Sequence, residues 1–121
     1  MVTIGGWLPG GPGDSTVRAL LLGVPLDLDR GLLYVGSVGS GLSTAERKAL
    51  AAALRRLEVP VSPFSTDSFG LPRGTRVRFV HPYLRAEVTY LELTAAGRLR
   101  QPVWRGLHTG ENPAPGCDWS R

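Results

Sequence analysis

Arginine side chains recur at alternate positions in two stretches of the chain, and their chemistry suits an anionic ligand. They are Arg76 and Arg78 in TRVRFV, and Arg98, Arg100 and Arg105 in GRLRQPVWR. Alternate residues of a β-strand point to the same face, so each closely spaced pair is expected to share one face. A planar guanidinium can donate two parallel hydrogen bonds to phosphate oxygens, so an arginine-lined strand suits a phosphate ligand. The same spacing also fits a half-buried strand whose basic face is simply solvated.

Positive charge is concentrated in one part of the chain. The formal net charge is +4, and residues 73 to 105 contain seven arginines but only two acidic residues, Glu87 and Glu92. A segment with this imbalance attracts polyanions, which include nucleic acids and acidic protein surfaces.

Residues for metal binding or catalysis are not grouped by the sequence. The single cysteine, Cys117, excludes an internal disulfide and a site made only of cysteines. His81 and His108 lack the spacing of metal ligands, so we expect no metal site. Asp27 and Asp29 follow an apolar run, where acidic residues most often form a turn. We therefore predict no catalytic residue in this chain.

A glycine-rich segment, GSVGSGLS over residues 36–43, partly matches the phosphate-binding pattern G-x-x-x-x-G-K-[ST]. However, Leu42 occupies the position of the lysine that must reach the β and γ phosphates. We therefore interpret the segment as a tight turn between a strand and a helix.

Apolar runs and alternating patterns predict strands over residues 2–8, 17–26, 32–38, 75–80 and 84–93, and a last strand carrying Arg98 and Arg100. The paired glycines in the first strand indicate a bend, and a change of phase near Tyr90 indicates a bulge. High glycine and proline contents fit short strands joined by many turns. These features predict an all-β fold with one helix.

One helix is predicted over residues 43–58. Ser43 and Glu46 have the S-x-x-E spacing of a capping box. The apolar stripe expected to face the core consists of Leu50, Ala53, Leu54 and Leu57. Pro60 is expected to end the helix.

The Pro/Ser/Gly-rich segment 59–74 is predicted to be a long loop. Phe64 and Phe69 are expected to pin this loop onto the barrel, and base stacking is the alternative role for their rings.

Several motifs resemble the C-terminal OB-fold domain of bacterial ATP-dependent DNA ligases of the end-joining type. In the last strand Gly97-Arg98-Leu99-Arg100, Pro102, Trp104, Gly106 and Leu107 match the family. The runs Ile4-Gly5-Gly6-Trp7, Tyr34 to Gly41 and Ala86-Glu87-Val88 are similar to family runs at corresponding places. The resemblance implies a five-stranded OB-fold barrel over residues 2–113, with a helix after the third strand and a flexible tail over 114–121.

The chain departs from the family at three positions. Where the family has Arg, Asp and Lys in its last nucleotidyltransferase motif, this chain has His108, Gly110 and Glu111. In the family that motif helps to position the ATP phosphates during enzyme adenylation. The resemblance therefore implies a degenerate form of the motif here.

The resemblance also implies a function: a DNA-binding domain that clamps duplex DNA opposite an adenylation domain, supplied in cis or in trans, during nick sealing in DNA repair and recombination. Arg76, Arg78, Arg98, Arg100 and Arg105 are the residues expected to contact DNA. ATP and Mg are implied as cofactors of the parent ligase, and none is expected on this chain alone.

The family's nucleophilic lysine lies in Lys-x-Asp-Gly, whereas the only lysine here, Lys48, is followed by Ala49 and Leu50. We therefore expect the chain to be inactive by itself. The alternative hypothesis is a non-catalytic OB barrel that binds an acidic protein partner or single-stranded nucleic acid.

No apolar run approaches the ~20 residues of a membrane span. The first ten residues, MVTIGGWLPG, lack the basic and long apolar regions of a signal peptide. We expect a cytoplasmic protein with no membrane partner.

Overall fold

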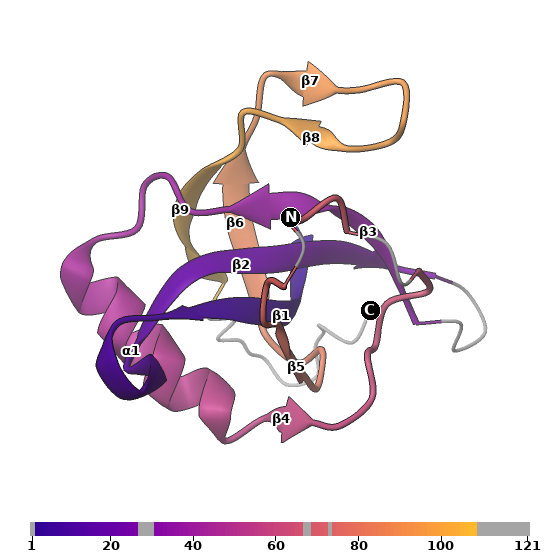
Figure 1. The fold of residues 1–121 in the computed structure, drawn as a ribbon. Coiled ribbons are helices and arrows are strands. Elements are labelled where there is room, and N and C mark those ends of the chain that lie inside the picture. Colours follow the sequence, from indigo (N-terminus) through magenta and orange to yellow (C-terminus); the bar gives the residue numbers. More distant parts are fainter. Residues whose placement is uncertain (1, 27–30, 67–68, 73, 109–121) are drawn as a thin grey trace, which may run out of the picture.

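A mostly β fold with one α-helix is seen in the computed structural model, which describes residues 2–26, 31–66, 69–72 and 74–108 (Figure 1). Its elements in chain order are β1 (Val2–Gly10), β2 (Thr16–Pro25), β3 (Leu32–Val38), α1 (Thr44–Arg55), β4 (Glu58–Val59), β5 (Arg78–Val80), β6 (Arg85–Thr89), β7 (Glu92–Leu93), β8 (Leu99–Arg100) and β9 (Val103–His108). A 3-10 turn, Pro12–Asp14, links β1 to β2.

Strand β1 is the centre of the main sheet. It pairs antiparallel with β2 along its length, and also with β5 and β6. Because Phe79 lies opposite Gly6 and Ala86 lies opposite Val2, β5 and β6 act as one interrupted strand. The β2–β3 and β6–β9 ladders complete five strand positions with the helix after the third. This arrangement confirms the predicted OB-type fold.

Backbone pairing leaves one gap in this barrel. In the described part of the chain no ladder joins β3 to β9, and the two sides meet where the Trp104 N–H donates to the Ser40 carbonyl at 2.7 Å. Gly41, with a φ of 93°, allows this approach, because a Cβ there would lie 2.6 Å from the Trp104 carbonyl oxygen. Leu42 packs in the core. The interpretation of this segment as a structural turn is therefore confirmed.

Two apolar clusters fill the fold. The larger one lies between the sheet and α1 and includes the fully buried Ile4, Trp7 and Leu54. The smaller one contains Phe64 and packs on the other side of β1, where Gly5 has no side chain. A Cβ at Gly5 would lie 2.6 Å from the Phe64 ring, so glycine is needed for this contact. The ladder is irregular at Gly5, as expected from the paired glycines.

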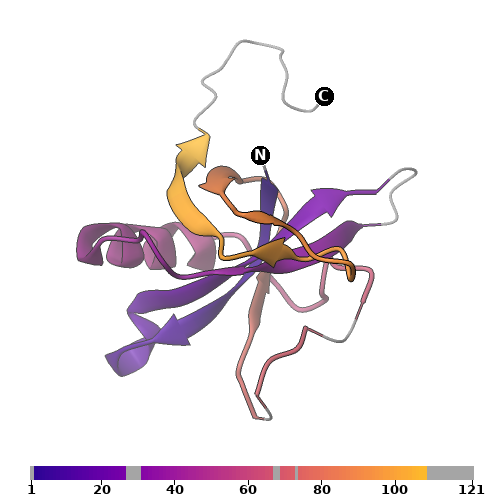
Figure 2. The same cartoon turned by 90° about the horizontal axis from the view of Figure 1, so that it is seen from above.

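Helix α1 lies beside β1 and β2 at one end of the sheet (Figures 1 and 2). Its capping box is confirmed: the Ser43 N–H donates to Glu46 Oε1 at 2.9 Å, and the Glu46 N–H donates to Ser43 Oγ at 3.1 Å. No helix in the described ranges has the length and apolar character that crossing a membrane requires.

The predicted extent and buried face of this helix were partly wrong. The helix ends at Arg55 rather than at residue 58, because Glu58 and Val59 leave it to form β4 against β5. The residues that it buries are Leu50, Ala51 and Leu54, whereas Ala53 is exposed.

The predicted arginine-rich last strand is in fact two strands in different sheets. Leu99–Arg100 forms β8, which pairs with β7 in a separate two-stranded sheet that projects from the barrel (Figure 1). Gln101 then adopts a φ of 51° and the chain returns to the main sheet as β9. The predicted strand over 84–93 is divided in the same way, so no bulge lies at Tyr90. The ladder irregularity lies instead between Glu87 and Val88.

Some expectations concern residues outside the described ranges. They are the turn at Asp27 and Asp29, the domain end at Pro113, and the tail over 114–121.

Candidate functional site

Arg76 and Arg78 lie together beside the first loop of the chain. Asp14 Oδ1 accepts a hydrogen bond from Arg76 Nη2, and Asp14 Oδ2 accepts one from Arg78 Nη2 at 2.9 Å. Arg78 Nη1 also contacts both oxygens of Glu58, at 2.9 and 2.8 Å. The four residues contain two positive and two negative charges, so this cluster is neutral overall.

The electrostatics of the cluster follow from these contacts. Hydrogen bonds from Arg76 and then Arg78 lower the pKa of Asp14 below its ordinary value of 3.8. The hydrogen bond to Asp14 is the main cause that raises the pKa of Arg78. Arg78 is half-buried, and its guanidinium lies 5.7 Å from the centre of the buried Trp7 ring. Arg76 keeps 66% of its side chain exposed, so its remaining donors are open to a ligand.

Arg98 and Arg100 lie on the projecting β7–β8 hairpin. The Arg98 guanidinium covers the Tyr34 ring at 4.8 Å and donates to the Ala96 carbonyl at 3.2 Å. Arg98 lies next to the turn of the hairpin, so this contact holds the tip of the hairpin on β3. Arg100 pairs with Glu92 at 3.0 Å, and both side chains are more than half exposed. An ion pair this exposed contributes little to stability, so Arg100 can exchange partners easily.

The remaining predicted site residues are on or beyond β9. Arg105 is exposed, and no ion pair or hydrogen bond of its side chain is present within the described ranges. His108 is the last residue of β9, and its backbone lies opposite Arg85 of β6. Gly110 and Glu111 fall outside the described residues.

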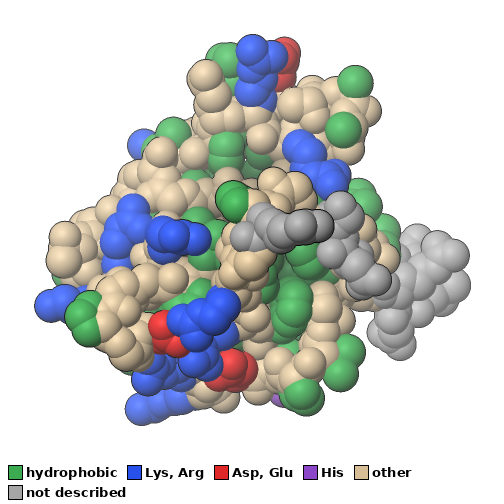
Figure 3. Space-filling view, in the orientation of Figure 1, with side chains coloured by type: hydrophobic (Ala, Val, Ile, Leu, Met, Phe, Trp, Pro, Cys, Tyr) green, Lys and Arg blue, Asp and Glu red, His purple; other side chains and the backbone are tan. Residues whose placement is uncertain are grey.

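The structure therefore groups the predicted arginines in pairs rather than in one stripe. Arg76 and Arg78 belong to the β5 end of the barrel, whereas Arg98 and Arg100 belong to the β7–β8 hairpin at the opposite end (Figure 1). On the face shown in Figure 3, the Lys and Arg side chains form separate patches with acidic side chains beside two of them. Arg76 lies before β5, which begins at Arg78, and Arg98 lies before β8, so neither pair alternates along one strand as predicted. The acidic partners were not predicted either.

Phe64 is buried and Phe69 is half-buried, as expected of residues that pin the loop. Their rings contact each other edge to face at 5.4 Å, and both contact Tyr34. The Tyr34 hydroxyl donates to the Phe69 carbonyl at 3.2 Å. Their faces are therefore used inside the protein, which argues against a base-stacking role for these two residues.

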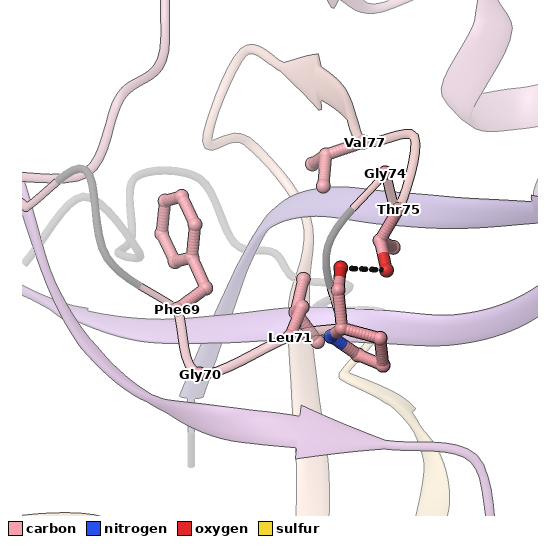
Figure 4. Close-up of a pocket in the computed structure, with 7 residues that line it drawn as sticks. Phe69, Gly70, Leu71, Gly74, Thr75 and Val77 are labelled. Carbon is pink, nitrogen blue, oxygen red and sulfur yellow. Dashed lines mark hydrogen bonds between the residues drawn. The ribbon is translucent and has the colours of Figure 1, made fainter.

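A shallow hollow of about 340 Å³ lies beside this loop and is lined by Phe69, Gly70, Leu71, Pro72, Gly74, Thr75 and Val77 (Figure 4). Its one side-chain hydroxyl, that of Thr75, already donates to the Pro72 carbonyl at 2.6 Å. These seven residues carry no charge, so the hollow does not suit a triphosphate. Within the described residues no three His, Cys, Asp or Glu side chains group as metal ligands.

Two residues of α1, Arg47 and Glu46, connect the helix to the strands that carry the candidate site. The sequence analysis did not predict this role for either residue. Arg47 donates to the Val17, Arg18 and Gly39 carbonyls at 2.7 to 2.9 Å, which ties α1 to β2 and to the glycine turn. Glu46 accepts from Trp104 Nε1 at 3.1 Å and so links the helix to β9. The sequence predicted the role of Glu46 in the capping box. No local pattern could predict its hydrogen bond with Trp104, which lies 58 residues later in the chain.

Comparison with known proteins places this geometry among ligases. Residues 13–110 match the family described as ATP dependent DNA ligase C terminal region. The chain is 44% identical over 115 residues to the multifunctional non-homologous end joining protein LigD of Mycolicibacterium smegmatis. The match covers 93% of this chain and 14% of that protein. The protein of the same name from Pseudomonas aeruginosa is 37% identical over 107 residues, covering 81% of this chain and 13% of its own length.

Solved structures show the same relationship. The ligase domain of M. tuberculosis LigD superposes with a TM-score of 0.74 at 44% sequence identity, covering 88% of this chain and 34% of that one. A mycobacterial DNA ligase D complexed with ATP and MES superposes with a TM-score of 0.73 at 43% identity, covering 88% and 33%. The chain thus spans about a third of these ligase structures.

Proposed function

The chain belongs to the family of ATP-dependent DNA ligase C-terminal regions, and from this premise we propose that it binds duplex DNA without sequence preference, as the DNA-clamping domain of an end-joining ligase. The observation that carries the proposal is the match to the ligase domain of LigD over 88% of the chain. The net charge of +4 favours an anionic partner.

The contacts we propose are phosphate contacts from arginine. Arg76, Arg100 and Arg105 are exposed, and Arg78 and Arg98 are half-buried beside them in sequence. An exposed guanidinium held at one side by a carboxylate still presents donors to a phosphate. Because phosphates are the same at every base pair, such contacts give affinity and orientation but no sequence choice.

Under this proposal an adenylation domain, in the same chain or in another, lies on the opposite side of the DNA. The relative lengths support such a division, since the matching region is about a third of the solved ligase structures. The hollow in Figure 4 is uncharged, and no three His, Cys, Asp or Glu side chains of the described residues group as metal ligands, so neither feature supports a site for ATP phosphates or Mg²⁺. We therefore assign both cofactors to the adenylation domain and only DNA contacts to this chain.

A salt titration tests the proposal. The binding of a labelled blunt duplex is measured between roughly 50 and 200 mM salt. If the three exposed arginines neutralise about three phosphates, log K should fall with log salt at a slope of about −3. Replacing Arg76, Arg100 or Arg105 by alanine should each flatten the slope by about 0.9.

Arg18→Ala is the matched control, because Arg18 is exposed on β2 and lies outside the proposed surface. It should leave the slope nearly unchanged. Absence of duplex binding at the lower salt, or equal effects of all four substitutions, would contradict the proposed surface.

A further inference from the structure

We propose that His81, Pro82 and Tyr83, the turn between β5 and β6, form a platform that stacks against an exposed base at a DNA end. The chain would then hold a DNA end with unpaired nucleotides more tightly than a blunt duplex. This inference rests on the proposed DNA binding, but it concerns a different part of the surface and a different kind of contact.

The platform is built from two stacked rings. The His81 and Tyr83 rings are nearly parallel, with an interplanar angle of 9° and centroids 5.2 Å apart. Tyr83 is 62% exposed, and neither ring belongs to the two core clusters. One face of the Tyr83 ring contacts His81, and most of the residue remains open to solvent. The two rings therefore form an exposed aromatic surface on which a further planar group can stack.

The backbone of the turn is fixed before any ligand arrives. The Tyr83 N–H donates to the His81 carbonyl at 2.8 Å, which closes a three-residue turn around Pro82. The proline ring fixes φ close to the value that such a turn requires. The His81 N–H donates to the Leu57 carbonyl at 2.8 Å, and the Leu84 carbonyl accepts from Ile4 at 2.9 Å. A preorganised surface of this kind loses little conformational entropy when a ligand stacks on it.

The surroundings favour the phosphates that accompany a base. Arg56, at the C-terminal cap of α1, is exposed and precedes the Leu57 that holds His81. Arg85 follows Tyr83 by two residues at the start of β6. The nearby Glu58 already contacts Arg78 through both carboxylate oxygens, which offsets its repulsion of an anion.

The geometry of DNA decides which base can reach this platform. Inside a duplex both faces of each base are covered by its neighbours, so an aromatic side chain has no face to contact. A blunt end presents only the outer face of its terminal base pair, which pairing holds in line with the duplex. An unpaired nucleotide can turn its free face toward the protein, and stacking on an aromatic side chain accepts any base. The ligand class is therefore an unpaired nucleobase with its flanking phosphates.

The test compares two labelled DNA duplexes of the same sequence, one blunt and one with a short single-stranded extension, and includes the single strand alone. The unmodified chain should bind the extended duplex about tenfold more tightly than the blunt one, equivalent to ~1.4 kcal/mol. Tyr83→Ala should abolish this preference and change the affinity for the blunt duplex much less than that for the extended one, whereas Tyr83→Phe, which keeps the ring, should retain the preference. Tyr90→Ala is the matched control, since Tyr90 is 48% exposed but belongs to a different part of the surface. It should leave the preference intact.

Several results would overturn the inference. They are blunt binding without any preference for the extension, a preference that survives Tyr83→Ala, or an equal loss in Tyr90→Ala. In each of these cases the proposed duplex binding would still stand. If no duplex binding is measured, the proposed function fails. In that case the binding of the single strand alone tests the platform. Single-strand binding that is lost in Tyr83→Ala would support the platform, and any other result would reject it.

Discussion

Replacing Asp14 by asparagine should strengthen DNA binding and make it more dependent on salt. Asp14 is the carboxylate that contacts both Arg76 and Arg78, with the Arg78 contact at 2.9 Å. A DNA phosphate that binds either guanidinium must compete with it. Asparagine keeps the size of the side chain but removes the charge, so the neutral cluster becomes positive by one unit. One additional phosphate neutralised steepens the slope of log K against log salt by about 0.9.

The same substitution has a defined effect on stability against pH. The two arginines lower the pKa of Asp14 in the folded protein below its ordinary value of 3.8. A lowered pKa means that the folded state prefers the charged form. The stabilisation is therefore complete above the ordinary value and is lost as the pH falls through the folded pKa. Asp14→Asn should be less stable than the unmodified chain near neutral pH, and the difference should shrink below pH 3.8.

The assay pairs Asp14→Asn with Glu87→Gln, which raises the net charge by the same amount. Glu87 is exposed on β6, and its side chain makes no ion pair in the part of the chain that the structure describes. Salt slopes are measured with blunt duplex DNA, and unfolding by urea is followed between acidic and neutral pH. Equal slopes for the two variants would refute the reasoning, because total charge alone would then explain the effect. A loss of stability independent of pH would refute the assigned role of Asp14.

Four further predictions concern the framework and the altered motif. Gly41→Ala should destabilise the fold by roughly 1–3 kcal/mol in urea unfolding, because the new Cβ would lie 2.6 Å from the Trp104 carbonyl oxygen. Gly97→Ala is the control: Gly97 also has a positive φ, but no atom lies within 4 Å of a Cβ there, so this change should cost less. Phe64→Ala should cost about 3–5 kcal/mol by the same measurement, because the ring packs against Leu21, Leu32 and Tyr34. Hydrogen bonds from Ser43 and Trp104 lower the pKa of Glu46 below its ordinary value of 4.5, so the stability that they give is lost as the pH falls below that value. Glu46→Gln should remove this loss, which is measured as a smaller dependence of the free energy of unfolding on pH below 4.5. With an adenylation domain fused before Val2, the combined change His108→Arg, Gly110→Asp and Glu111→Lys should increase the adenylation rate at least about tenfold. This increase needs a lowering of the activation free energy by only ~1.4 kcal/mol. Equal rates would show that the altered motif is tolerated.

Short sequence patterns correctly predicted the start of the helix, the bounds of the third strand and an irregularity in the first strand. The capping box at Ser43 and Glu46 fixed the start of α1, and the apolar run of residues 32–38 matches β3 at both ends. The paired glycines of β1 correctly indicated an irregular ladder. The capping box joins residues only three positions apart, so a local pattern could predict it. The bounds of β3 and the irregularity at Gly5 were also predicted, although β3 pairs with β2 and Gly5 makes room for the distant Phe64 ring.

The helix end and the last strands depended on partners elsewhere in the chain. Glu58 and Val59 follow the helix closely and were predicted to lie at its end, but they pair with Val80 and Phe79 and form β4. Helical periodicity cannot detect this competition. Leu99 and Arg100 likewise pair with β7 rather than continuing into β9, because the chain turns at Gln101 with a positive φ.

The charge of the candidate surface was decided by tertiary structure alone. The sequence determined that the arginines alternate and that residues 73 to 105 are basic. Asp14, which offsets two of those charges, lies 62 residues before Arg76 and 64 before Arg78. Likewise, the aromatic residues of the loop are turned inward, whereas the exposed ring stack formed at a turn around Pro82. Composition counts charges and rings, but only the folded chain decides which carboxylate meets each guanidinium and which ring face remains open, because those contacts depend on distances in space rather than along the sequence.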